Sequence, residues 1–227
     1  IVRLDENGTV DVAFLDSLPA INGQISSLLI QEDGRILVGG DMLISTETGG
    51  VDRQFKNIGR LKRDGSADLG FQPVSSIVGS ENRLDGIVRS IVVQPDGRII
   101  LGGDFSSYGG LVRSGVLRLD HNGELDNSIN FGLGANGSVR SAAVQDDFRI
   151  VIAGDFSSFN GVDARGIARI YGGLDYNPGE IRFEKPTYTV NENGVSDSIY
   201  IIREGGVSDQ ASFKIKTSSV NAVDGQD

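Results

Sequence analysis

The residues best able to do chemistry in this chain are aspartates and arginines that recur at matching positions. Because the same residues return in successive segments, they do not define one asymmetric active site. An arginine guanidinium binds a carboxylate through paired hydrogen bonds. We therefore predict three structural ion pairs: Asp41–Arg60, Asp104–Arg118 and Asp155–Arg169. A ring of these aspartates that binds a cation in a central channel is the alternative.

Catalytic and zinc-binding residue types are scarce, since the 227 residues include one histidine and no cysteine. His121 lies beside an expected turn and is interpreted as a surface residue. Without a second histidine or a cysteine, the sequence offers no Zn²⁺ site and no Cys–His pair, and its serines have no positioned base. Carboxylates are numerous enough for a glycosidase, but no pattern places two of them together. We therefore expect no enzyme.

Two acidic loops superficially resemble a Ca²⁺-binding loop. They read Asp5-x-Asn7-Gly8-x-x-Asp11 and Asp120-x-Asn122-Gly123-x-x-Asp126. In both, glycine follows asparagine directly, as a two-residue β-hairpin requires. The pattern therefore predicts a type I′ turn at Asn122-Gly123 and not a metal site.

The overall composition argues against two classes of protein. The formal net charge is −10 and the isoelectric point is about 4.6, so the chain should repel phosphate backbones and bind no nucleic acid. No apolar run approaches the ~20 residues needed to span a bilayer, which predicts no transmembrane segment. The 32 glycines against 5 prolines favour many tight turns.

The positioning elements follow from an internal repeat. One segment occurs at 31–41, 94–104 and 145–155, and an Arg-Leu or Arg-Ile pair recurs at intervals of 57, 58 and 51 residues. The unit is therefore about 50–60 residues long.

Each unit divides into strand-sized pieces, which in the central unit are residues 88–94, 98–101 and 114–120, with a short fourth strand towards Phe131. Gly97 should take the position of positive φ in the first turn. Gly102-Gly103 predicts a bulge or a close approach of a neighbouring backbone. Four antiparallel strands per repeat are typical of a propeller blade, with Ile99–Leu101 and Ile150–Ile152 on equivalent buried strands. A stacked β-solenoid is the alternative.

The motifs Gln94-Pro-Asp-Gly-Arg-Ile-Ile-Leu-Gly-Gly-Asp-Phe105 and Arg118-Leu-Asp-His-Asn-Gly-Glu-Leu-Asp126 resemble the delta-60 repeat of large bacterial surface and secreted proteins. The resemblance covers about residues 1–171 and implies an all-β chain of β-propeller blades, with no common catalytic role. Residues 1–173 would form about three and a half blades, whereas a propeller ring closes with ~4–8. We therefore expect the open faces to be covered by the remainder of a longer polypeptide or by other protein chains.

Composition changes after a linker at 174–178. Residues 179–227 resemble the first part of a Calx-β domain, an immunoglobulin-like β-sandwich, through Phe183-x-x-Pro-x-Tyr-x-Val-x-Glu192, Arg203-x-Gly-Gly206 and Ala222-x-x-Gly-x-Asp227. Some members of that family bind Ca²⁺, and Glu192 and Asp227 match two acidic positions, while Ser219 stands where such members often carry aspartate. Ca²⁺ takes 6–8 oxygen ligands, so these two carboxylates make an incomplete metal site.

By resemblance, the chain is expected to be extracellular or at a bacterial cell surface. The favoured function is a structural or adhesive scaffold that mediates protein–protein or surface contacts. A propeller or Calx-β module that binds glycan or Ca²⁺ is the alternative. Sugar rings stack on aromatic side chains, and Tyr108 and Phe159 are the only aromatic residues in the repeated loop after Gly-Asp-Phe-Ser-Ser.

Overall fold

The computed structural model describes residues 1–48, 50–72, 84–173, 180–183 and 199–204. The chain divides into two compact units, Ile1–Leu174 and Asp175–Asp227. In the second unit the described elements are β14 (Glu180–Phe183) and β15 (Ile201–Glu204), which pair antiparallel. The expected Calx-β sandwich otherwise lies outside the described residues.

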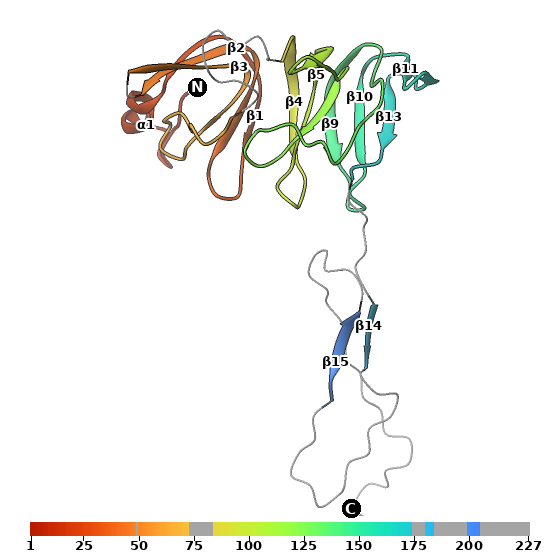
Figure 1. The fold of residues 1–227 in the computed structure, drawn as a ribbon. Helices are drawn as coiled ribbons and strands as arrows, with labels where there is room; N and C mark the ends of the chain where they lie inside the picture. The colour runs from red at the N-terminus through yellow and green to blue at the C-terminus, as the bar shows by residue number, and fades with distance from the viewer. Residues whose placement is uncertain (49, 73–83, 174–179, 184–198, 205–227) are drawn as a thin grey trace, which may run out of the picture. The chain divides into compact units, whose positions relative to one another are not determined.

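Ile1–Leu174 contains three antiparallel sheets of three strands each. The first sheet holds β1 (Ala20–Ile30), β2 (Ile36–Thr48) and β3 (Val51–Leu61); the second holds β4 (Ile87–Val93), β5 (Ile99–Asp104) and β8 (Val116–Leu119); the third holds β9 (Ser138–Val144), β10 (Ile150–Asp155) and β13 (Ile167–Ile170). Figure 1 shows the sheets side by side in chain order, and they form no closed ring. The prediction of an all-β chain is confirmed.

The smaller elements lie between the main strands. They are α1 (Val12–Ser17), the pair β6 (Ser107–Tyr108) and β7 (Leu111–Val112), and the pair β11 (Ser158–Phe159) and β12 (Val162–Asp163). The Asp11 side chain accepts a hydrogen bond from the Phe14 N–H and so caps α1. Among the described residues, no helix has the length and apolar character needed to cross a membrane.

Two of the three apolar clusters lie between successive sheets. Ile99 and Leu101 of β5 pack with the first sheet, while Ile100 between them packs with the third. This alternation follows from the two-residue period of a strand, and it makes β5 apolar on both faces. Ile150 and Ile152 of β10 are fully buried in the same apolar cluster as Ile100. The predicted equivalence of residues 99–101 and 150–152 is confirmed, because β5 and β10 are the central strands of their sheets.

Gly102 and Gly103 lie at a β-bulge, and Gly102 also lies close to the next sheet. The ladder between β4 and β5 shifts register between Val88 and Ser90, directly opposite Gly103 and Gly102. A Cβ atom on Gly102 would lie 2.8 Å from Cγ1 of Val139 in the third sheet. The glycines therefore accommodate a β-bulge in their own sheet and a close approach from the next one.

Two local predictions were wrong. Gly123 has φ +90°, but Asn122 does not share a positive φ, and Asp120 accepts from the Gly123 N–H at 3.1 Å. A type I′ turn needs positive φ at both central residues, whereas this loop has the pattern of a type I turn followed by a glycine bulge. The expected fourth strand is reduced to one bridge, Leu119 with Leu125, so the sheet of β4, β5 and β8 has three strands.

Candidate functional site

The predicted pair Asp104–Arg118 does not form. Asp104 instead accepts a hydrogen bond from Arg89 Nε at 2.6 Å. The register explains the error, because Arg118 lies opposite Ile100 while Asp104 lies four residues farther along β5. At about 3.3 Å per residue, that offset is roughly 13 Å along the strand.

The same offset separates the other predicted partners. Asp155 binds Arg140, with Nε 2.6 Å from Oδ2, instead of Arg169. In the first sheet Arg60 binds Asp68 and not Asp41. The predicted pairs Asp155–Arg169 and Asp41–Arg60 are therefore also wrong.

The β-bulges explain how Arg89 and Arg140 reach their aspartates. Each is the unpaired extra residue of its strand, between Val88 and Ser90 in β4 and between Val139 and Ser141 in β9. A bulge redirects a side chain relative to the regular pleat. The first sheet has Ser26 at this position, so Asp41 has no equivalent arginine.

In the second and third sheets the first strand thus supplies an arginine and the next strand its aspartate: Arg89 with Asp104, and Arg140 with Asp155. The hydrogen bond from Arg89 holds the pKa of Asp104 below its ordinary value, although burial opposes the shift, and the Ser138 hydroxyl adds to it. The Arg140 hydrogen bond likewise lowers the pKa of Asp155. Both carboxylates are thus already compensated by guanidinium. Among the described residues, no group of three or more His, Cys, Asp or Glu side chains is placed to hold a metal ion.

Three of the four recurring arginines, Arg3, Arg60 and Arg118, bind an aspartate eight residues later. Arginine Nε lies 2.8 Å from the carboxylate in Arg3–Asp11, 2.7 Å in Arg60–Asp68 and 2.9 Å in Arg118–Asp126. Sequence reasoning missed this pairing, although an aspartate stands eight residues after the arginine in three repeats.

Each of these arginines also reaches the following repeat. Arg3 Nη1 donates to the Arg63 carbonyl at 2.6 Å, Arg60 Nη1 donates to the His121 carbonyl at 2.6 Å, and Arg118 Nη1 donates to the Gly172 carbonyl. Every accepting carbonyl lies three residues after the next recurring arginine position. One side chain thus joins two repeats, and His121, an exposed residue as expected, contributes its backbone to that contact.

Arg118 is the most enclosed of these arginines, at 2% exposure. Burial lowers the pKa of its guanidinium, while Asp126 opposes that shift. Burial would raise the pKa of Asp126, but hydrogen bonds from Ser128 and the charges of Arg118 and Arg98 outweigh it and leave the pKa lowered. The pair is therefore held in its ionised form inside the protein.

A serine on the first strand of the first and second sheets makes a second contact to the following sheet. The Ser27 hydroxyl accepts from the Ile91 N–H at 3.1 Å, and the Ser90 hydroxyl accepts from the Ala142 N–H at 3.0 Å. Ser141 is the third member of this series and is exposed. Sequence reasoning missed these serines too, although they recur at one position of the repeat.

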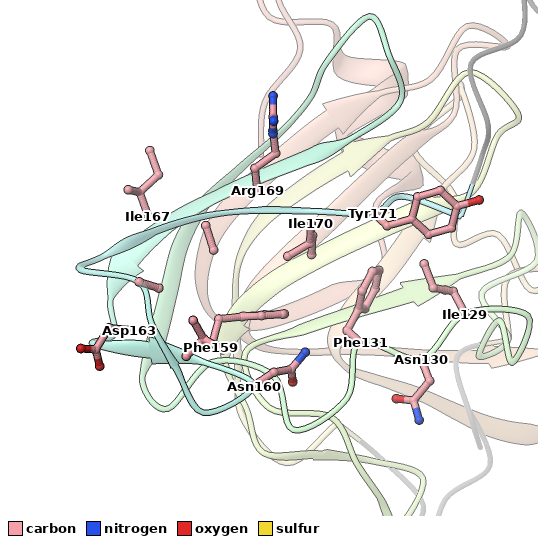
Figure 2. Close-up of a pocket in the computed structure, with 13 residues that line it drawn as sticks. Ile129, Asn130, Phe131, Phe159, Asn160, Asp163, Ile167, Arg169, Ile170 and Tyr171 are labelled. Carbon is pink, nitrogen blue, oxygen red and sulfur yellow. The ribbon is translucent and has the colours of Figure 1, made fainter.

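The aromatic residues considered for glycan binding lie in different surroundings. Tyr108 is 1% exposed and donates its hydroxyl to the Gly123 carbonyl at 3.0 Å, so its ring is not available for stacking on a sugar. Phe159 lines a pocket of about 500 Å³ with Phe131, Ile170 and Tyr171 (Figure 2).

The two residues considered for Ca²⁺ binding, Glu192 and Asp227, lie outside the described residues.

The comparisons with known proteins support the repeat. Residues 31–71, 94–128 and 145–170 each match the family described as "Domain of unknown function (DUF5122) beta-propeller". The three matches begin at equivalent glutamines of the three repeats and support the resemblance to delta-60-type propeller repeats. No curated protein matches the chain.

Proposed function

We propose, from the premise that residues 31–170 contain β-propeller repeats, that this chain is a non-catalytic scaffold segment of a large secreted or cell-surface bacterial protein. It would mediate contacts with other proteins or with a surface. Residues 179–227 would add the start of a Calx-β-like domain, with Glu192 and Asp227 as two of the acids near a calcium site.

One observation carries this proposal: the recurring charged residues serve as connections between repeats. Arg60 and Arg118 each bind an aspartate of their own repeat and a carbonyl of the next. Catalytic residues need a pKa and a geometry matched to one reaction, whereas Arg60 and Arg118 have equivalent structural partners in successive repeats. This use of the arginines is what a scaffold requires.

The pocket in Figure 2 favours the second candidate, which is binding of a glycan or another small ligand. Its volume of about 500 Å³ lies within the ~300–1,000 Å³ of typical ligand sites. Phe131, Phe159 and Tyr171 supply aromatic surface to it. Tyr108 at the equivalent loop of the second repeat is buried, so this surface belongs to the third repeat and does not recur.

The scaffold role of Arg118 is tested by Arg118→Met in the full chain. We expect the free energy of unfolding to fall by about 1–3 kcal/mol, because the buried Gly172 carbonyl loses its donor and Asp126 keeps only Arg98 as a cationic partner. Urea unfolding followed by circular dichroism measures the change. Arg149→Met is the matched control, since Arg149 pairs with Asp147 at the surface, and its midpoint should stay that of the parent. Equal midpoints for both variants would contradict the scaffold role.

The second candidate is tested on the same protein with a glycan array and with melting curves in calcium and in EDTA. The scaffold proposal expects no saturable glycan binding and the same melting temperature in both buffers. A glycan whose binding is lost on Phe159→Ala would favour the ligand-binding function, as would a melting temperature raised by calcium.

A further inference from the structure

Three places in the chain show how the outer edge of a third strand is covered. A short returning segment bridges that edge through an apolar residue: Val10 opposite Leu4, Ala67 opposite Leu61, and Leu125 opposite Leu119. The next residue in each segment is the aspartate that binds the recurring arginine, and its N–H also donates to that arginine's carbonyl at 2.9, 2.9 and 3.0 Å. The covering segment is therefore an extended strand in which an apolar residue is followed by aspartate.

Its two side chains point to opposite faces. Leu125 packs against the core between the first and second sheets, whereas Asp126 binds Arg118, which faces the third sheet. This alternation follows from the two-residue period of a strand. The returning segment therefore makes one apolar contact, on one face, and one charged contact, on the other.

The edge of β13 presents the same features. Arg169 lies opposite Val151 as Arg118 lies opposite Ile100, so the Arg169 carbonyl faces the outer edge as the Arg118 carbonyl does. In Figure 2 the Arg169 side chain extends away from Phe131 and Phe159. An extended strand beside β13 would therefore meet the pocket on one face and Arg169 on the other.

The pocket of Figure 2 lies where the apolar residue of a returning segment would pack beside β13. Phe131, Phe159 and Ile170 line it. Their equivalents beside β8 are Phe71, Tyr108 and Leu119, all at most 1% exposed, and Leu125 packs against that cluster. At the edge of β13 the described residues leave this space open.

The charges at this edge call for a carboxylate. Arg169 is exposed and forms no ion pair among the residues that the structure describes. Arg98 lies 2.7 Å from Asp126 and Arg35 lies 3.6 Å from Asp68, so a second arginine also binds the returning aspartate, and Arg149 is its equivalent here. Yet the residue eight positions after Arg169 is Asn177. The sequence therefore has no aspartate eight residues after Arg169.

A complete further repeat fits this end of the third sheet less well than a single strand. Gly39 and Gly102 stand where a Cβ would lie 2.6 Å and 2.8 Å from the valine of the following repeat. The third sheet has Ala153 at this position. Its outer face is therefore less suited to close packing of another repeat than the faces of the other two sheets.

We propose that the outer edge of β13 is a docking site for an extended strand of another protein, in which an aliphatic residue is followed by aspartate. The strand adds antiparallel to β13, as in other cases where a partner extends a sheet at its edge. Its aliphatic side chain enters the pocket of Figure 2, and its aspartate binds Arg169. This inference rests on the proposed scaffold function and specifies the partner that the scaffold binds.

The chain's own returning segment provides the probe. A fluorescein-labelled peptide of residues 120–128 is titrated with the full chain, and fluorescence anisotropy reports binding. Saturable binding is expected, and the same peptide with Asp126→Asn should bind about ten-fold or more weakly, because a charged hydrogen bond is lost. In the protein, Arg169→Gln should weaken binding of the parent peptide to a similar degree. The control Arg165→Gln changes an exposed arginine of the same repeat and should leave the affinity unchanged.

Either of two results would overturn the inference: no saturable binding of the parent peptide, or equal affinity of the parent protein and the Arg169→Gln variant. Amide shifts in a nuclear magnetic resonance titration locate the peptide, and shifts confined to residues away from Ile167–Ile170 would also count against it. The Arg118→Met unfolding experiment uses no peptide. Failure of docking with the expected loss of stability in Arg118→Met would therefore remove this inference and leave the scaffold function standing.

Discussion

Arg118 connects the second repeat to the third through hydrogen bonds. Arg118 bonds to Asp126 and Ser128 within its own repeat, to the Gly172 carbonyl in the next, and to Gln94. Lysine could not replace it, because a planar guanidinium presents five donors in fixed directions whereas an ammonium group has three. The residue type follows from the number and direction of the partners.

The Arg89–Asp104 pair predicts a specific response to acid. The pKa of Asp104 is lowered in the folded chain, first by the Arg89 hydrogen bond. Its stabilising contribution is therefore fully present above the ordinary aspartate pKa of about 3.9 and is lost as the pH falls through the lower folded value. Arg89→Met should reduce the loss of stability in that range.

Urea midpoints measured from pH about 5 downward test this prediction. Arg113→Met is the control, because Arg113 donates to the Val112 carbonyl and forms no ion pair among the described residues. Its acid profile should match that of the parent. If the urea midpoint of Arg89→Met falls with pH in parallel with that of the parent, the lowered pKa of Asp104 does not depend on Arg89.

At the scale of the element, the close approach of two strands determines which residues β5 can hold. Gly102 has no positive φ, so its backbone would accept a larger residue, and the restriction comes from Val139 in the third sheet. Ala153 occupies the same place in β10, and no further repeat packs against it within the described part of Ile1–Leu174. Substitutions at Gly102 and Ala153 therefore distinguish the effect of packing against the next sheet from the effect of backbone conformation.

Gly102→Val is expected to lower the free energy of unfolding by about 1–3 kcal/mol, because its extra methyl groups would overpack the contact with Val139. Ala153→Val, the matched change in the third sheet, should have a much smaller effect. Thermal or urea unfolding of both variants measures the difference. Similar losses in the two would mean that valine is disfavoured by the strand itself and not by the neighbouring sheet.

At the scale of the whole molecule, the repeats are joined by a small set of contacts that return at each junction. Arg60 and Ser27 join the first sheet to the second repeat, and Arg118 and Ser90 join the second sheet to the third repeat. In repeat proteins, stability is the sum of terms within repeats and terms between neighbours. The arginine and serine contacts contribute to the terms between neighbouring repeats.

Ser90→Ala should therefore cost about 0.5–1.5 kcal/mol, because the Ala142 N–H loses its acceptor. Hydrogen exchange should show the largest increase in rate at that amide in the third sheet. Ser141→Ala removes the equivalent hydroxyl in β9, whose sheet has no further repeat beside it within the described part of Ile1–Leu174, and should change neither quantity. An unchanged Ala142 amide in Ser90→Ala would contradict the role of this contact.

The sequence by itself determined the repeat, the three main strands of the central unit and positions where glycine is needed. These follow from local physics: alternation within a strand places Ile99 and Leu101 on one face, and Gly97, at φ +83°, closes its turn where most residues would be strained. The Arg118–Asp126 pair also left a visible signal, since the same spacing occurs in three repeats.

Only the tertiary structure decided the remaining partners. Asp104 was assigned to Arg118 from spacing, but the register places these residues four positions apart on neighbouring strands. A one-residue bulge then directs Arg89 to the carboxylate. The Gly172 carbonyl, 54 residues from Arg118, becomes its partner when the sheets pack. Contacts of this kind depend on register and packing between sheets, which local residue preferences do not specify.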